Sequence, residues 1–198
     1  MSTVTVSDTS FVGSDRLLVG IVLSVLTFWL FAQSVINVVP AMKSSLDISL
    51  ETLTLAVSLS ALFSGCFVVA SGGLADKFGR MRMTTLGLGL SIIGSAMLVL
   101  AQGPGLFLAG RVLQGLSAAC IMPATLALIK TWYQGRARQR AVSFWVIGSW
   151  GGSGLCSFVG GAIATGLGWR WIFVFSIAVA LLALFLLRGT PESRSASA

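Results

Sequence analysis

The stretch GGLADKFGRMRM, from Gly72 to Met83, decides the fold of this chain. It places Asp76, Lys77, Arg80 and Arg82 close together, whereas positions 52–75 and 83–110 carry no charged residue. A helix that crosses ~30 Å of hydrocarbon needs roughly 20 apolar residues, because each residue adds ~1.5 Å. The stretch is therefore interpreted as a short polar connection between two membrane helices. Whether it is only a solvated turn or a working part depends on its detailed pattern.

The composition of the whole chain indicates an all-α integral membrane protein. Hydrophobic residues make up 56%, charged residues 10%, and the mean hydropathy is +0.94. Such values exclude a soluble domain. Six spans are predicted, at 17–40, 53–73, 83–101, 106–129, 141–167 and 171–187. They form one six-helix bundle over 17–189, between a tail at 1–16 and a tail or linker at 190–198 that is expected to be disordered from Pro191 onward.

The basic residues are distributed unevenly between the two sides of the membrane. Ten of the thirteen flank loops on one side, only Lys43 and Arg170 lie on the other, and Arg111 lies within a span. The positive-inside rule then places both termini and the opening stretch in the cytoplasm, with the chain in the cell membrane. The net charge of +7 reflects this topology and some attraction to anionic lipid rather than a nucleic-acid partner.

Enzyme chemistry is disfavoured by the residues present. The chain has no histidine, and its three cysteines fall at small-residue positions inside spans, where they are expected to pack. We find no catalytic dyad and no metal-ligand set. No metal site and no cofactor are predicted.

The opening stretch has features of a conformational latch. Gly79 permits a sharp reversal with positive φ, and Gly72 allows the second helix to end against a neighbour without side-chain bulk. Asp76 can pair with Arg80 or Arg82, or can face the positive end of a helix from elsewhere. Contacts that form in one state and break in another would act as a latch. A solvated turn is the alternative.

Arg111 lies about five residues into the fourth predicted span. A guanidinium in hydrocarbon costs at least ~2.5–3.5 kcal/mol, so it is expected to face a polar interior. Gln114 shares its helix face, and Gly115 follows. The alternative is an arginine that extends to the outer surface, because it lies near that end of the span.

Two further spans carry patterned residues. In the fifth span, Gly148, Gly152 and Gly160 recur with Cys156 at intervals of four, which is typical of close helix packing. In the first span, Trp29, Gln33 and Asn37 also recur at intervals of four. Polar groups on one face of a membrane helix face either a cavity or a neighbouring helix. Both interpretations remain open for this face.

Three of these patterns resemble signatures of one family. G-x-L-A-D-K-x-G-R-x-R resembles the cytoplasmic signature between the second and third helices of the major facilitator superfamily, with Met81 in place of a usual base. R-x-x-Q-G, from Arg111, looks like the fourth-helix motif of its proton antiporters. GSGLCSFVGG, ending at Gly161, partly matches the antiporter signature of the fifth helix. There Cys156 and Ser157 replace the Gly-Pro pair to which the kink is attributed.

The resemblance extends to the fourteen-helix drug/proton antiporters and implies a function. The fold would be one major facilitator half, made of two inverted three-helix repeats, with the proton gradient as its energy source. Its substrates would be lipophilic or zwitterionic drugs, such as quinolones, dyes and biocides. The resemblance assigns a cytoplasmic gate to Gly72, Asp76, Lys77, Gly79, Arg80 and Arg82, proton coupling to Arg111, Gln114 and Gly115, the antiporter glycines to Gly148, Gly152, Gly160 and Gly161, and a substrate cavity to Trp29, Gln33, Asn37 and Met122.

Two other functions remain open at this stage. PES at 191–193 echoes a sugar-transporter motif, so a nutrient uniporter or symporter half is one alternative. A non-transporting, truncated membrane protein is the other. The family needs further helices that this sequence does not contain, because alternating access requires two halves around a site. The chain is therefore expected not to transport without a C-terminal half or a second copy.

Overall fold

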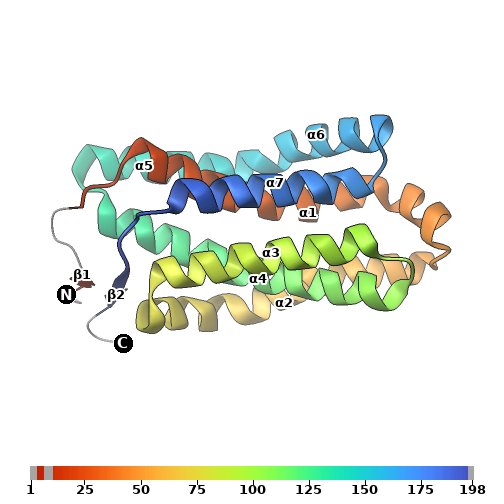
Figure 1. The fold of residues 1–198 in the computed structure, drawn as a ribbon, viewed down its shortest axis with the longest axis horizontal. Helices are drawn as coiled ribbons and strands as arrows, with labels where there is room; N and C mark the ends of the chain where they lie inside the picture. The colour runs from red at the N-terminus through yellow and green to blue at the C-terminus, as the bar shows by residue number, and fades with distance from the viewer. Residues whose placement is uncertain (1–3, 7–10, 196–198) are drawn as a thin grey trace.

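The computed structural model describes residues 4–6 and 11–195 of the chain. Within them lie six helical segments long and apolar enough to cross a membrane, as predicted (Figure 1). The fifth segment is continuous from Gly135 to Gly166 but contains one π-helical turn. The elements are α1 (Asp15–Leu46), α2 (Leu50–Phe78), α3 (Arg80–Leu100), α4 (Pro104–Trp132), α5 (Gly135–Val146), η1 (Ile147–Gly151), α6 (Gly152–Gly166) and α7 (Arg170–Leu187).

Short polar residues set the starts of the first two helices. The hydroxyl of Ser14 accepts a hydrogen bond from the Leu17 N–H, and that of Ser49 accepts one from the Thr52 N–H. α1 does not end at Pro40, where its span was predicted to end, but continues to Leu46. Membrane helices tolerate an internal proline because neighbouring groups satisfy the freed backbone carbonyl.

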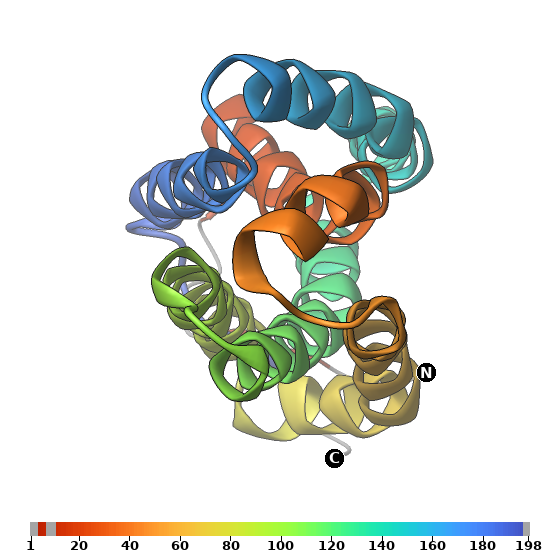
Figure 2. The ribbon, with the colours of Figure 1, turned by 90° about the vertical axis from the view of Figure 1, so that its right-hand side faces the viewer.

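The helices pack around α1 and α4, which run through the middle of the bundle (Figure 2). α4 packs against α2 and α3, whereas α1 packs against α6 and α7. One buried apolar cluster includes Phe31, Phe107 and Phe173, and a second includes Ile21 and Leu128. The outer faces of α2 and the fifth segment remain apolar and exposed, as expected for surfaces that lipid or further helices cover.

The ends of the chain pair with each other, which was not predicted. β1 (Val4–Val6) runs antiparallel to β2 (Ser193–Ser195), with Thr5 opposite Arg194. Both strands lie at the same end of the bundle (Figure 1). The expectation of a disordered tail is therefore wrong for residues 191–195, which backbone pairing and the Glu192 side chain order, whereas residues 196–198 lie outside the described residues.

The connection between α4 and α5 holds the start of α1 in place. The hydroxyl of Tyr133 donates a hydrogen bond of 2.6 Å to the Ser14 carbonyl. Burial raises the pKa of this phenol to about 12, so Tyr133 stays a hydrogen-bond donor at physiological pH.

Candidate gate and coupling sites

The opening stretch is helical rather than a loop. α2 continues to Phe78, α3 begins at Arg80, and Gly79 alone separates them. Gly79 has φ of +124°, in the region that favours glycine, and its N–H bonds to the Ala75 carbonyl. The predicted positive φ is confirmed, whereas the expected multi-residue connection is compressed to one residue.

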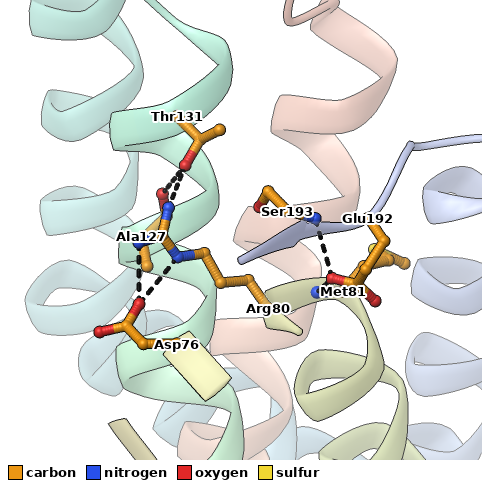
Figure 3. A network of polar contacts seen from close by, with 7 residues as sticks. All are labelled: Asp76, Arg80, Met81, Ala127, Thr131, Glu192 and Ser193. Atoms are coloured by element: carbon orange, nitrogen blue, oxygen red, sulfur yellow. Dashed lines mark hydrogen bonds and ion pairs between the residues drawn. The ribbon is translucent and has the colours of Figure 1, made fainter. Parts of the chain in front are cut away.

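Arg80 joins α2 to α4 (Figure 3). Its Nε and Nη2 atoms lie 3.0 and 2.8 Å from Asp76 Oδ1, and its Nη1 donates to Thr131 Oγ1 on α4. The Arg80 side chain is 10% exposed and that of Asp76 is 41% exposed, so the ion pair is shielded from solvent on the arginine side only. Of the two bases considered for Asp76, Arg80 is the one in contact.

Arg82 instead faces Glu192, a residue near the end of the chain. The Glu192 carboxylate accepts hydrogen bonds from the N–H groups of Met81 and Arg82, at 2.9 and 3.0 Å. Its Oε2 also lies 3.9 Å from Arg82 Nε. α3 has no acidic residue in its first turn, so Glu192 supplies the negative charge that a helix N-terminus favours.

Sequence reasoning did not assign Glu192 to this site. A signal was present, because the first turn of α3 has a glycine N-cap and two arginines but no acceptor side chain. Such a helix start requires an acceptor from elsewhere.

The two remaining residues assigned to the gate, Gly72 and Lys77, make fewer contacts. A Cβ on Gly72 would lie 3.6 Å from Pro123 Cβ, an ordinary contact distance. The prediction that Gly72 avoids side-chain bulk is therefore wrong, and α2 also extends beyond it. Lys77 is exposed, with its Nζ 5.9 Å from the centre of the Phe78 ring.

Arg111 is fully buried and does not extend to the surface. Its Nε bonds to the Ala56 carbonyl at 3.2 Å, and its Nη1 bonds to the Phe31 carbonyl at 2.7 Å. Nη1 also bonds to Gln114 Oε1 at 2.8 Å, and Nη2 to Ser60 Oγ at 2.7 Å. These four acceptors come from α1, α2 and α4, and all are neutral. The guanidinium is thus hydrogen-bonded, while these acceptors leave its charge uncompensated.

The neighbours of Arg111 in its motif complete this polar site. Gln114 extends the hydrogen-bond network to α3, because its Nε2 donates a hydrogen bond of 3.2 Å to Ser95 Oγ. Gly115 lies so close to the Ser60 backbone that a side chain there would overlap it. The glycine therefore lets α2 approach α4 and brings Ser60 within reach of the guanidinium.

A cavity of about 130 Å³ adjoins Arg111 between α1 and α2. Arg111 and Ser60 form its polar wall. The rest is apolar and comes from Phe28, Ala32, Ile36, Val57 and Ala61. Its mostly apolar walls and few polar groups resemble those of small-molecule sites, but such sites usually measure about 300–1,000 Å³, so this cavity alone is too small for a drug-sized ligand.

The glycines of the fifth segment pack against α1. A Cβ on Gly152 would lie 2.7 Å from Leu26 Cδ2, and one on Gly148 would lie 3.2 Å from Val22 Cγ1. Gly160 is buried, whereas a Cβ on Gly161 would meet no atom within 4 Å. Only part of the glycine pattern therefore has a packing role in this chain.

A π-helical turn precedes the two residues that replace the Gly-Pro pair. η1 covers Ile147–Gly151, and α6 begins at Gly152. Single π-helical turns are a known cause of helix kinks and occur frequently at functional sites. The fifth segment is therefore irregular at this turn although it contains no proline there.

Of the four residues assigned to a substrate cavity, the three with described side chains do not gather in one place. Trp29 packs beside Gly152, and Asn37 donates a hydrogen bond to Ser157 on α6. Met122 packs with the second apolar cluster, and the Gln33 side chain lies outside the described residues. Interhelical contact, the alternative left open above, accounts for the positions of Trp29 and Asn37.

The chain matches the profile of one known protein family. The profile of the Major Facilitator Superfamily matches residues 17–198. The chain belongs to this superfamily. It is therefore a multi-pass protein of the cell membrane from a family of transporters, and it has the six-helix fold of one major facilitator half.

Individual relatives show which members of the superfamily the chain is similar to. The quinolone resistance protein NorB of Staphylococcus aureus (strain JH9) is 60% identical over 188 residues, which cover 95% of this chain and 41% of that protein. The same values hold for strain Newman. The chain thus spans less than half the length of these curated relatives.

Solved structures show the same fold. The proton:xylose symporter XylE bound to 6-bromo-6-deoxy-D-glucose superposes with a TM-score of 0.78 at 19% identity, over 90% of this chain and 45% of that one. The peptide transporter POT in complex with sulfate gives 0.77 at 18% identity, over 89% and 37%.

Proposed function

We propose that this chain forms the N-terminal half of a proton-coupled multidrug exporter whose substrates include quinolones. The observation that carries the proposal is the 60% identity to the quinolone resistance protein NorB over 95% of the chain. In this account, drugs are lipophilic or zwitterionic molecules that bind in a cavity completed by a second half. Protons moving down their gradient supply the energy, and no cofactor takes part.

Arg111 is the residue proposed to couple protons to drug transport. A positive charge with only neutral acceptors stabilises any carboxylate that comes close and lowers the pKa of that carboxylate. All six acids of this chain lie outside the apolar spans, so the responding acid would come from the substrate or from the other half. Proton release and drug binding would then depend on the same buried charge.

The contacts around Gly79 support a gate at this end of the bundle. Arg80 connects α2 to α4, while Glu192 connects the end of the chain to α3. If α2 moves relative to α4 during transport, the contacts of Arg80 must break and reform. We propose that Asp76 and Arg80 control closure of the cytoplasmic side.

A chimera tests the proposed function. Residues 17–190 would replace the matching part of NorB, and cells that lack other exporters would produce the protein. We expect export of a quinolone and of a lipophilic cationic dye, and we expect a protonophore to stop both.

The control is a chimera with the same junctions but an unrelated major facilitator half in place of residues 17–190. Uptake of one polar solute, without drug export, would contradict the proposal and favour the nutrient transporter. Membrane insertion without any transport would favour the non-transporting alternative.

A further inference from the structure

A groove runs along the side of α1, between the fifth segment and α7. Its inner part, about 150 Å³, is walled by Leu26, Val159 and Phe175 among other apolar residues of α1, α6 and α7. Its outer part, about 340 Å³, lies between α1 and α5 and ends at Asp15 and Arg140. Leu23 lines both parts, so we treat them as one feature, the lateral groove.

The lateral groove is separate from the cavity beside Arg111. The cavity beside Arg111 is bounded on α1 by Phe28, Ala32 and Ile36, none of which lines the groove. In the end-on view, α6 and α7 lie on either side of α1 (Figure 2). Neither the gate nor the coupling network uses this groove, so its role is independent of the proposed function.

We propose that a glycerophospholipid occupies the lateral groove, with one acyl chain along the apolar walls and its phosphate on Arg140. The rim residues Val19 and Leu155 are 49% and 59% exposed, so the groove opens to the surface. Water has no polar partner along the inner walls, and an empty groove would forfeit dispersion contacts. An acyl chain is the filler that a membrane supplies.

Selectivity for a phospholipid must come from the polar end of the groove. Lipid tails are as apolar as leucine, so chain burial alone does not favour a bound lipid over bulk lipid. Arg140 Nη2 lies 3.3 Å from Asp15 Oδ1, with both side chains more than half exposed. Its guanidinium carbon also lies 5.7 Å from the centre of the Phe144 ring, which holds the group at the mouth of the groove.

An exposed ion pair of this kind contributes little stability and can exchange its anion. A phosphate can replace the Asp15 carboxylate and accept two parallel hydrogen bonds from the Arg140 guanidinium. The displaced Asp15 carboxylate stays in the first turn of α1, where the helix N-terminus stabilises it. Arg16 and Arg138, by contrast, already donate to backbone carbonyls.

Native mass spectrometry of the purified, delipidated chain tests the phosphate contact. Titration with phosphatidylglycerol is expected to give a complex with one retained lipid. Arg140→Gln should weaken binding about tenfold, the effect of one charged hydrogen-bond partner. Arg136→Gln removes an exposed charge of the same segment that does not line the groove, and binding should not change. Diacylglycerol, which lacks the phosphate, should bind the unmodified chain as weakly as phosphatidylglycerol binds Arg140→Gln.

A second pair of variants tests the apolar part of the groove. Val159→Trp fills the inner part and should reduce retention of the lipid, whereas the neighbouring Phe158→Trp points outward and should not. Circular dichroism would establish that all variants keep their helix content. Equal losses within either pair, or no loss with Arg140→Gln, would overturn the proposal. The proposal would also be overturned if the lipid-free chain formed a dimer and Val159→Trp dissociated that dimer. A second copy of the chain would then occupy the groove.

Discussion

Arg111 is the residue on which the proposed coupling depends, because its guanidinium is fully buried and its hydrogen-bond acceptors are all neutral. Its place in an apolar span predicts a polar interior, and burial of the side chain agrees with that expectation. Its partners on other helices were not predictable, because Phe31, Ala56 and Ser60 lie 51 to 80 positions away. Phe31 and Ala56 accept through their backbone carbonyls. Every residue has such a carbonyl, so the residue type does not indicate the contact.

The charge of Arg111 is expected to be indispensable for coupling. In the chimera, Arg111→Ala should abolish proton-driven drug export but leave membrane insertion intact, because the charge that responds to protons is lost. Efflux of a dye from loaded cells measures the effect, and an immunoblot of membranes measures insertion. Arg136→Ala is the control, as an exposed arginine outside the network. Undiminished export by Arg111→Ala would disprove the coupling role.

Gly79 is expected to be required for stability. Gly79→Ala should lower the free energy of unfolding by about 1–3 kcal/mol, because the φ of +124° at this position is unfavourable for alanine. Its Cβ would also overlap the Glu192 carboxylate. Denaturant unfolding of the purified chain in detergent measures the change.

A matched control and a double variant separate the two causes. Gly73→Ala, in the exposed part of α2, should be neutral or slightly stabilising. Combining Gly79→Ala with Glu192→Ala should remove the overlap and leave the backbone strain. An unchanged unfolding free energy for Gly79→Ala would show that the helix junction adapts.

At the scale of the element, glycine spacing predicted that the fifth segment packs closely but did not name its partner. The structure assigns α1 to Gly148 and Gly152 and shows open space at Gly161. The interval of four residues separates Gly161 from the stripe, but it cannot say which helix the stripe contacts. The π-helical turn was equally unpredictable, since it depends on local backbone pairing rather than on a residue pattern.

The contact between α6 and α1 can be tested with one substitution. Gly152→Val should lower the unfolding free energy by about 1–3 kcal/mol, because the added methyl groups overlap Leu26 and Trp29. Thermal unfolding followed by circular dichroism measures the loss. Gly161→Val adds the same side chain to the same helix where no neighbour lies within 4 Å. Equal effects of the two variants would mean that valine acts through helix propensity alone.

At the scale of the whole molecule, the six spans and their order followed from composition, whereas the closure of the two chain ends did not. β1 and β2 join segments at opposite ends of the sequence, and three-residue strands carry too little pattern to be recognised. Glu192 belongs to the same closure, since it reaches the start of α3. The interpretation of this tail as disordered rested on composition alone and missed both contacts.

Glu192 should protect the start of α3 from exchange with solvent. In Glu192→Ala, the amides of Met81 and Arg82 should exchange their hydrogens faster, because both lose their acceptor. Hydrogen–deuterium exchange with mass spectrometry measures the peptide that contains them. Arg194→Ala, an exposed residue of β2, should leave this peptide unchanged. Unaltered exchange in Glu192→Ala would show that the cap does not persist in solution.

The central claim is that this chain supplies the proton-coupling half of a drug exporter. The most direct measurement records the pH gradient of inverted membrane vesicles that contain the chimera and have an acidified interior. Antiport predicts that an added quinolone enters the vesicles while protons leave, so the gradient falls, and that Arg111→Ala prevents this fall. A gradient that stays constant in the unmodified chimera, while the quinolone still accumulates inside, would contradict the claim.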